Sequence, residues 1–251
     1  MRVLDLNNNN LQDSGVKLLS AAASHPNRNE AIVGWTEEST LETGHSQRLC
    51  WSDPPPPFRV EPAGVRWLRP GLRKYSCQLT INTNTVHTNL KLSDNNRKVT
   101  HAEEVQSYPD HPDRFDVYEQ LLCRDGLTGR CYWEVEWTGD VEISVSSRKI
   151  RRKGDSTDCL FGWNDQSWSL ICSDDRPRSV RQNKTERSIS SSSYSVSNRV
   201  AVYVNCPAGT LSFYRVSSDT LIHLHTFNTT FTETLYPGFW FRSPGSSVCL
   251  C

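Results

Sequence analysis

The fold is decided by the stretch Tyr132-Trp133-Glu134-Val135-Glu136-Trp137, in which apolar and polar side chains alternate. Successive side chains of a strand point to opposite faces, so Trp133, Val135 and Trp137 share one face. The residues between them share the other. One buried and one more polar face is typical of a strand in an antiparallel sheet. We therefore predict a strand here, with both tryptophans in the core.

The alternation continues on the C-terminal side of this strand. Val141, Ile143 and Val145 follow the turn signal Gly139-Asp140, which predicts a hairpin with the first strand.

Further along the chain, residues 199–204 and 210–214 flank Pro207-Ala208-Gly209 and predict a second hairpin. Additional short strands are expected over 221–227, 235–241 and 247–251. No helical period of useful length occurs after Ala23. Short strands separated by turn residues indicate an all-β, antiparallel, jelly-roll-like sandwich.

Residues 1–24 follow a different pattern. Leu4-x-Leu6-x-x-Asn9-x-Leu11 is the core of a leucine-rich repeat, and the alternative is an isolated amphipathic helix after a strand. One repeat cannot bury its own faces, so we expect a partial α/β repeat that ends a longer array. Residues 25–61 are predicted to be an irregular, Pro-rich linker, because four prolines at 54–57 favour an extended spacer. The β-domain is then expected over 62–251.

Charge excludes two classes of partner. Lys and Arg together number 28, as do Asp and Glu, and the net charge is +0. Nucleic-acid binders present a strongly basic surface, and membrane-surface binders a polybasic cluster, so neither partner is expected. The balance conceals an uneven distribution: residues 101–142 carry eleven acidic residues and three arginines, whereas 148–187 carry ten basic and six acidic residues. We expect the basic run 148–153 to be a solvated loop, with binding of an acidic partner as the alternative.

The nine cysteines are scattered, without C-x-x-C spacing, and no apolar segment follows Met1-Arg2 as it does in a secretory signal peptide. Reduced thiols and a cytoplasmic location are therefore expected.

Catalytic arrangements are not apparent. The sequence has neither a Gly-x-Ser-x-Gly elbow nor a His-Glu-x-x-His pair, and we expect no enzyme, no catalytic residue and no cofactor. His223 and His225 fall on one strand face, as metal ligands often do, but a third ligand is missing and no metal site is predicted. Glu134 and Glu136 also share a face, for which solubility at a sheet edge or a cross-strand partner is the simpler explanation.

Several separated motifs resemble the PRY-SPRY family. The central signature is the stretch at 132–136 preceded by Gly126-Leu127-Thr128-Gly129-Arg130, and segments at 75–80, 89–93, 97–99 and 109–115 resemble the PRY half. The late hairpin and the closing Leu235-Tyr236-Pro237-Gly238-Phe239 also fit. The residues that carry the structural motif are Trp133, Glu134, Val135, Glu136, Gly209, Leu211 and Phe213.

A leucine-rich-repeat end followed by this domain further resembles the NACHT and leucine-rich-repeat (NOD-like) receptors of fish. The resemblance implies a non-catalytic domain of a cytosolic innate-immune receptor that binds a protein or peptide through loops at one end of the sandwich. By the same resemblance, the binding residues are expected to be Ile171, Asp174 and Trp240, then Tyr108 and Asp110. Trp240 belongs to the stretch Phe239-Trp240-Phe241-Arg242. Trp133, Trp137, Trp163 and Trp168 are expected in the core.

Two alternatives remain open at this point. A lectin-like or small-ligand-binding sandwich would use a surface tryptophan to stack on a sugar. An inactive gene fragment would explain the lone repeat and the linker.

Overall fold

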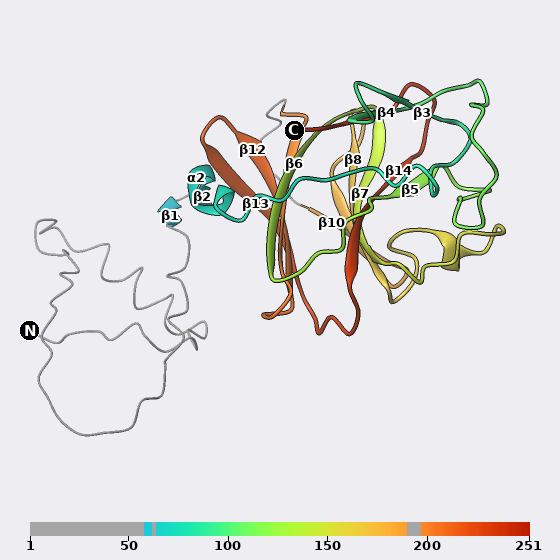
Figure 1. Ribbon diagram of the computed structural model, residues 1–251. Helices are drawn as coiled ribbons and strands as arrows, with labels where there is room; N and C mark the ends of the chain where they lie inside the picture. Colours follow the sequence, from blue (N-terminus) through green and yellow to red (C-terminus); the bar gives the residue numbers. More distant parts are fainter. Residues whose placement is uncertain (1–57, 62–63, 190–196) are drawn as a thin grey trace, which may run out of the picture. The chain divides into compact units, whose positions relative to one another are not determined.

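The described residues form two antiparallel sheets (Figure 1). A computed structural model describes residues 58–61, 64–189 and 197–251. The predicted leucine-rich repeat at 1–24, the linker up to residue 57 and most of the Ser-rich loop at 188–197 lie outside these residues.

The nine-stranded sheet has the order β1-β2-β13-β12-β11-β6-β15-β4-β3. Its strands are β1 (Phe58–Glu61), β2 (Gly64–Leu68), β3 (Leu90–Ser93), β4 (Lys98–His101), β6 (Arg130–Thr138), β11 (Arg199–Asn205), β12 (Thr210–Ser217), β13 (Thr220–Asn228) and β15 (Ser247–Leu250). The predicted hairpin around Gly209 is confirmed, because β11 and β12 pair antiparallel. Strand β1 pairs with β2 and begins before Pro62, within the stretch expected to be an irregular linker.

The six-stranded sheet has the order β10-β9-β8-β7-β14-β5. Its strands are β5 (Gln120–Leu122), β7 (Asp140–Ser147), β8 (Ser167–Ser173), β9 (Ser179–Gln182), β10 (Thr185–Ser188) and β14 (Leu235–Phe241). The described helices are short: α2 spans Arg69–Arg73 and the 3-10 helix η1 spans Thr157–Cys159. No helix in the described ranges is long and apolar enough to cross a membrane.

The main core lies between the two sheets. Trp133, Val135 and Trp137 of β6 face inward and pack in one cluster with Ile143 of β7 and Phe239 of β14. Burying an aliphatic or aromatic side chain of this size contributes about 1.5–3 kcal/mol to stability. The antiparallel β-sandwich and the inward face of the first strand are thus as predicted.

The predicted hairpin at Gly139-Asp140 is wrong. Strand β6 pairs with β11 and β15, whereas β7 pairs with β14 and β8, so the chain passes from one sheet to the other at this point. Gly139 makes the corner possible. Its φ is +75°, and a Cβ there would lie 2.7 Å from the Ser246 Oγ. Glycine alone meets both conditions without strain.

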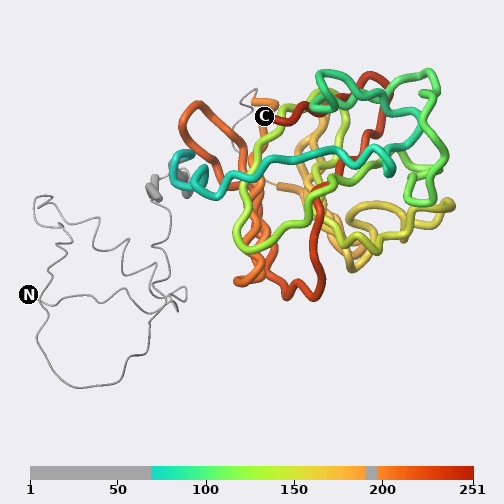
Figure 2. Tube along the Cα trace, viewed as in Figure 1, coloured from blue at the N-terminus to red at the C-terminus, as the bar shows by residue number. Residues whose placement is uncertain are grey.

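A segment without regular structure connects the sheets on another side. After α2 it crosses from β6 to β5, as Figure 2 shows. The Cys77 N–H donates to the Tyr132 carbonyl at 2.9 Å, and the Asn82 N–H donates to the Leu122 carbonyl at 3.0 Å. The segment therefore fastens β6 of one sheet to β5 of the other.

Candidate functional site on the outer face of the six-stranded sheet

Two of the sequence-predicted site residues share a row on the outer face of the six-stranded sheet. Trp240 of β14 lies opposite Glu142 of β7, and Glu142 lies opposite Ile171 of β8. These side chains alternate along their strands with residues of the core, such as Phe239, and so face away from it. The structure thus brings Ile171 and Trp240 to the same face, with a carboxylate between them.

The carboxylate of Glu142 is buried and paired. Arg181 Nη1 lies 2.7 Å from Glu142 Oε1, and Arg242 Nη1 lies 3.7 Å from the same oxygen. Glu142 itself is 0% exposed, and its Oε2 has no hydrogen-bond partner among the described residues. Burial raises the pKa of Glu142 to about 7, although both arginines act to lower it. Desolvation of the charged carboxylate outweighs its pairing.

Both arginines also stack on tryptophans. The Arg181 guanidinium lies 4.8 Å from the centre of the Trp163 ring, and that of Arg242 lies 5.1 Å from the Trp240 ring. These contacts continue the ion pairs, giving a chain Trp163, Arg181, Glu142, Arg242, Trp240, which we call the Trp–Arg cluster. Half-buried tryptophans held by arginines are the residue types that dominate binding energy in protein interfaces.

Each tryptophan of the Trp–Arg cluster keeps an unused donor. The Nε1 atoms of Trp163 and Trp240 have no hydrogen-bond partner within the part of the chain that the structure describes. Buried polar atoms are nearly always paired in proteins. Both N–H groups are buried, like those of the core tryptophans Trp133, Trp137 and Trp168, so the exposed parts of the two rings, and not their N–H groups, are what the cluster offers a partner.

Trp163 and the two arginines were missed by the sequence analysis, which placed Trp163 in the core. The structure corrects this: Trp163 is half-buried and lies against Arg181, outside the apolar core. Arg242 could have been found, because it stands two residues after Trp240 and therefore on the same strand face.

The other predicted site residues have local structural contacts. Ile171 lies within β8 rather than in a loop, and it is 4% exposed although it alternates with the inward-facing Cys172. Asp174 is exposed, and its Oδ2 accepts a 2.7 Å hydrogen bond from the Gly139 N–H at the corner between the sheets.

Tyr108 and Asp110 precede this face along the chain. The Tyr108 hydroxyl donates to the Leu90 carbonyl at 2.6 Å, and the Arg114 guanidinium lies 5.0 Å from the Tyr108 ring. Asp110 is exposed. The contacts of Tyr108 tie it to β3 at the edge of the nine-stranded sheet, and not to the Trp–Arg cluster.

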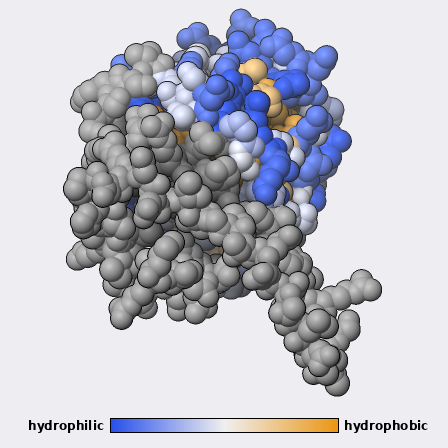
Figure 3. Space-filling view, turned by 90° about the vertical axis from the view of Figure 1, so that its left-hand side faces the viewer, coloured by the Kyte–Doolittle hydropathy of each residue, from blue (hydrophilic) through white to orange (hydrophobic). Residues whose placement is uncertain are grey.

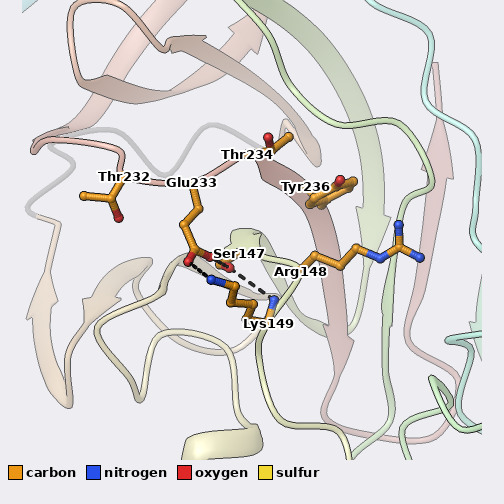
Figure 4. Close-up of a pocket in the computed structure, with 7 residues that line it drawn as sticks. All are labelled: Ser147, Arg148, Lys149, Thr232, Glu233, Thr234 and Tyr236. Carbon is orange, nitrogen blue, oxygen red and sulfur yellow. Dashed lines mark hydrogen bonds and ion pairs between the residues drawn. The ribbon is translucent and has the colours of Figure 1, made fainter.

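A pocket of about 500 Å³ opens on the same strand, β14, that carries Trp240. It is lined by Ser147, Arg148, Lys149, Thr232, Glu233, Thr234 and Tyr236 (Figure 4). Lys149 pairs with Glu233, which also accepts a 2.5 Å hydrogen bond from the Ser147 hydroxyl. The Arg148 guanidinium lies 5.9 Å from the Tyr236 ring. The pocket combines paired charged groups with one aromatic wall, Tyr236.

The acidic and basic segments of the sequence meet in the fold. Arg148 lies 3.7 Å from Asp113, and the Gly154 N–H donates to Asp116 at 3.0 Å. The basic run is therefore partly paired with acidic residues, and its Arg148 and Lys149 reach the pocket. The described surface in Figure 3 is mostly hydrophilic, and Val105 and Val117 are the exposed large hydrophobic residues among those described.

The two histidines do not share a face, contrary to the sequence analysis. A β-bulge makes His223 and His225 pair with the adjacent residues Tyr214 and Phe213. Because one extra residue reverses the side-chain alternation, His223 contacts Tyr214 edge to face, while His225 makes an edge-to-face contact with Phe227 on the core side. No group of His, Cys, Asp or Glu in the described ranges has the arrangement of a metal site.

Glu134 lies in the interior of its sheet and not at an edge. It has partners: Arg69 at 2.5 Å, Arg199 at 3.1 Å and the Tyr132 hydroxyl at 2.6 Å. Because Arg69 is the first residue of α2, its ion pair with Glu134 holds α2 against β6.

Comparison with known proteins identifies the domain. Residues 79–127 match the SPRY-associated domain, PRY, and residues 130–251 match the SPRY domain. Neoverrucotoxin subunit alpha of Synanceia verrucosa is 41% identical over 172 residues, which are 68% of this chain and 24% of that protein. Tripartite motif-containing protein 16 of Mus musculus is 33% identical over 178 residues, 70% of this chain and 31% of that protein.

Solved structures agree with the fold. The structure of stonustoxin superposes with a TM-score of 0.69 at 35% identity, covering 73% of this chain and 30% of that one. The PSpry domain of TRIM65 superposes with a TM-score of 0.65 at 23% identity, and the match covers 79% of this chain and 99% of that one. The chain spans about a quarter of the length of the toxin subunits that it matches.

Proposed function

Because this chain carries a PRY and a SPRY domain, and so belongs over residues 79–251 to the PRY-SPRY family, we propose that it is a non-catalytic domain that captures a protein partner on the outer face of its six-stranded sheet. SPRY domains are in general protein-interaction modules. The Trp–Arg cluster carries the proposal, since its two half-buried tryptophan rings and the arginines stacked on them are the residue types that dominate binding energy in protein interfaces. A peptide segment lying across β14 would contact Trp240 at one point and the Tyr236 pocket at another.

Peptide selection from a random library tests this proposal. Peptides are selected on the wild-type chain, and their affinities are then measured for Trp240→Ala and Trp163→Ala. Loss of an interface hot spot costs about 2 kcal/mol or more, so we expect roughly a 30-fold weaker Kd for each variant. The matched control is Val105→Ser, since Val105 is 70% exposed and unconnected to the cluster. Peptides that bind all four proteins equally would place the site elsewhere.

The wider setting is part of the same proposal. The leucine-rich pattern at 4–11 and the scattered cysteines favour a cytoplasmic innate-immune receptor in which NACHT and leucine-rich-repeat domains precede this domain. Sequencing the full-length transcript and locating the native protein by immunofluorescence test this setting. A transcript without those domains would contradict it.

A second candidate follows from the relatives. Toxin subunits of Synanceia are 38–41% identical to this chain, which favours a recognition module of a larger toxin-like protein. The two candidates differ in the domains encoded upstream and in cell lysis by the full-length product. The lectin-like alternative is tested by a glycan array, where sugar binding lost in Trp240→Ala would support it.

A further inference from the structure

The two arginines of the Trp–Arg cluster differ in how far the protein itself uses their charge. The Arg181 side chain is 5% exposed, and both of its terminal nitrogens are paired: Nη1 lies 2.7 Å from Glu142 Oε1, and Nη2 lies 2.5 Å from Glu186 Oε2. The Arg242 side chain is 27% exposed, and its carboxylate contact among the described residues, Glu142 Oε1, lies 3.7 Å from Nη1. That separation is longer than a hydrogen bond. Arg242 thus keeps donors that the described residues do not occupy.

Arg242 also lies beside a residue suited to binding. Its guanidinium lies 5.1 Å from the centre of the half-buried Trp240 ring. The backbone fixes this position, because the Arg242 N–H donates to the Asp140 carbonyl at 2.9 Å. The charge of the Asp140 carboxylate is compensated by Arg176, whose Nη2 lies 2.5 Å from it. A planar guanidinium held against an aromatic ring can donate two parallel hydrogen bonds to a carboxylate.

The two ends of the Trp–Arg cluster differ in charge. At the Arg181 end, the exposed carboxylate of Glu186 would repel an acidic group of a partner. At the Arg242 end, the facing carboxylate is that of Glu142, which is 0% exposed and does not reach the surface. Electrostatic complementarity fixes the register of a partner more than it adds affinity. An acidic group of a partner is therefore favoured at the Arg242 end.

We propose that the segment captured on this face is acidic and that one of its Asp or Glu carboxylates pairs with Arg242, while a neighbouring side chain covers Trp240. The inference rests on the proposed function and adds the chemistry of the partner. A side chain that covers the ring also excludes water from the ion pair, and the lower local dielectric strengthens the attraction.

Glu142 should make this pairing depend on pH. The charged side chains that face it among the described residues are Arg181 from β9 and Arg242 after β14, and the uncharged Ile171 lies opposite it on β8. Burial raises the pKa of Glu142 to about 7. Ionised Glu142 attracts Arg242 and repels the partner's carboxylate, whereas the protonated form does neither. The carboxylate of the partner stays ionised at these pH values, because its ordinary pKa is about 4. Affinity should therefore rise as the pH falls from about 8 to about 6.

A double-mutant cycle on selected peptides tests the pairing. Peptides selected on the wild-type chain are synthesised with an amidated C-terminus, so that Asp and Glu supply their only carboxylates. A second version of each peptide replaces Asp by Asn or Glu by Gln, and both versions are measured on the wild type and on Arg242→Gln. Either change alone should weaken Kd about tenfold or more, and the two together little further, because each removes one partner of the same ion pair. The amide peptides on the wild-type chain give a result that does not depend on whether a variant folds.

Three further variants serve as controls. Arg187→Gln removes an exposed arginine of β10 and should leave Kd within about twofold of wild type. Arg242→Lys keeps the charge without the planar fork, so its Kd should lie between those of the wild type and Arg242→Gln. The wild-type Kd for acidic peptides should tighten about tenfold between about pH 8 and about pH 6, and Glu142→Gln should remove this dependence.

The outcomes separate this inference from the proposed function. Peptides that need Trp240 but tolerate loss of their acidic groups, or that bind Arg242→Gln as they bind the wild type, would overturn the acidic pairing and leave the proposed face in place. Peptides indifferent to Trp240→Ala would overturn both. Self-association of the chain that Arg242→Gln abolishes would identify a second copy as the occupant and would also overturn the inference. A wild-type Kd that is constant with pH would contradict the competition by Glu142.

Discussion

Arg181 on β9 donates a 2.7 Å hydrogen bond to Glu142, two strands away on β7, and both side chains are buried. The same guanidinium contacts Glu186 at 2.5 Å and stacks on Trp163. One arginine thus holds a buried carboxylate, an exposed carboxylate and a tryptophan of the proposed binding surface. The stability of the sheet and the shape of the surface depend on the same residue.

Replacing Arg181 should therefore destabilise the fold. Arg181→Ala removes the 2.7 Å hydrogen bond to the buried Glu142, and leaving a buried polar group without its partner costs about 1–3 kcal/mol. Urea unfolding at neutral pH measures the loss. Arg187→Ala on the neighbouring β10 is the control, because Arg187 is exposed and its loss should cost under about 1 kcal/mol. Equal losses in the two variants would contradict the role given to Arg181.

Glu142 should make stability depend on pH. Burial raises its pKa in the folded protein to about 7, above the ordinary value of 4.5, so the folded state holds a proton that the unfolded state releases. Protonated Glu142 contributes about 3 kcal/mol to the free energy of unfolding. This contribution is fully present below pH 4.5 and is lost as pH rises through about 7.

The Glu142→Gln variant isolates this effect, because it keeps the shape and removes the titration. The free energy of unfolding of the wild type minus that of the variant should fall between about pH 4.5 and about pH 7. Glu134, whose pKa is lowered mainly by Arg69 and Tyr132 against the effect of burial, contributes in the opposite direction and is common to both proteins. A difference that is constant with pH would show that Glu142 is ionised throughout.

The corner between the sheets should tolerate no side chain at Gly139. Gly139→Ala places a Cβ 2.7 Å from the Ser246 Oγ at a φ of +75°, and we expect a loss of about 2 kcal/mol or more. Gly154→Ala is the matched control, since its φ is +91° and its Cβ would have nothing within 4 Å. Thermal unfolding compares the two. A smaller loss at Gly139 than at Gly154 would rule out the crowding argument.

Tyr108 should stabilise the fold more than it binds a partner. Tyr108→Phe removes the hydroxyl that donates to the Leu90 carbonyl, and a lost hydrogen bond of this kind costs about 1 kcal/mol. The affinity of selected peptides should stay within about twofold of wild type, in contrast to Trp240→Ala. A tenfold weaker Kd for Tyr108→Phe would instead support a place for Tyr108 in the binding surface.

The site could be predicted only in part, for physical reasons. Trp240 was expected from the resemblance to the PRY-SPRY family, and not from its spacing or its neighbours. Trp163 was not predicted as a site residue, because a tryptophan close to a second tryptophan in the chain, here Trp168, is expected to lie in the core. In the fold Trp163 lies against Arg181, which belongs to a strand later in the chain.

The sequence by itself determined which side chains face the core, since the period of two along 132–137 is a local property of an extended chain. Tertiary structure decided which strands pair. β6 and β7 are separated by one residue and yet lie in different sheets, because pairing depends on partners distant in the chain. The charges show the same division: the sequence contained an acidic and a basic segment, and only the fold placed Asp113 against Arg148, because electrostatic pairing depends on distance in space.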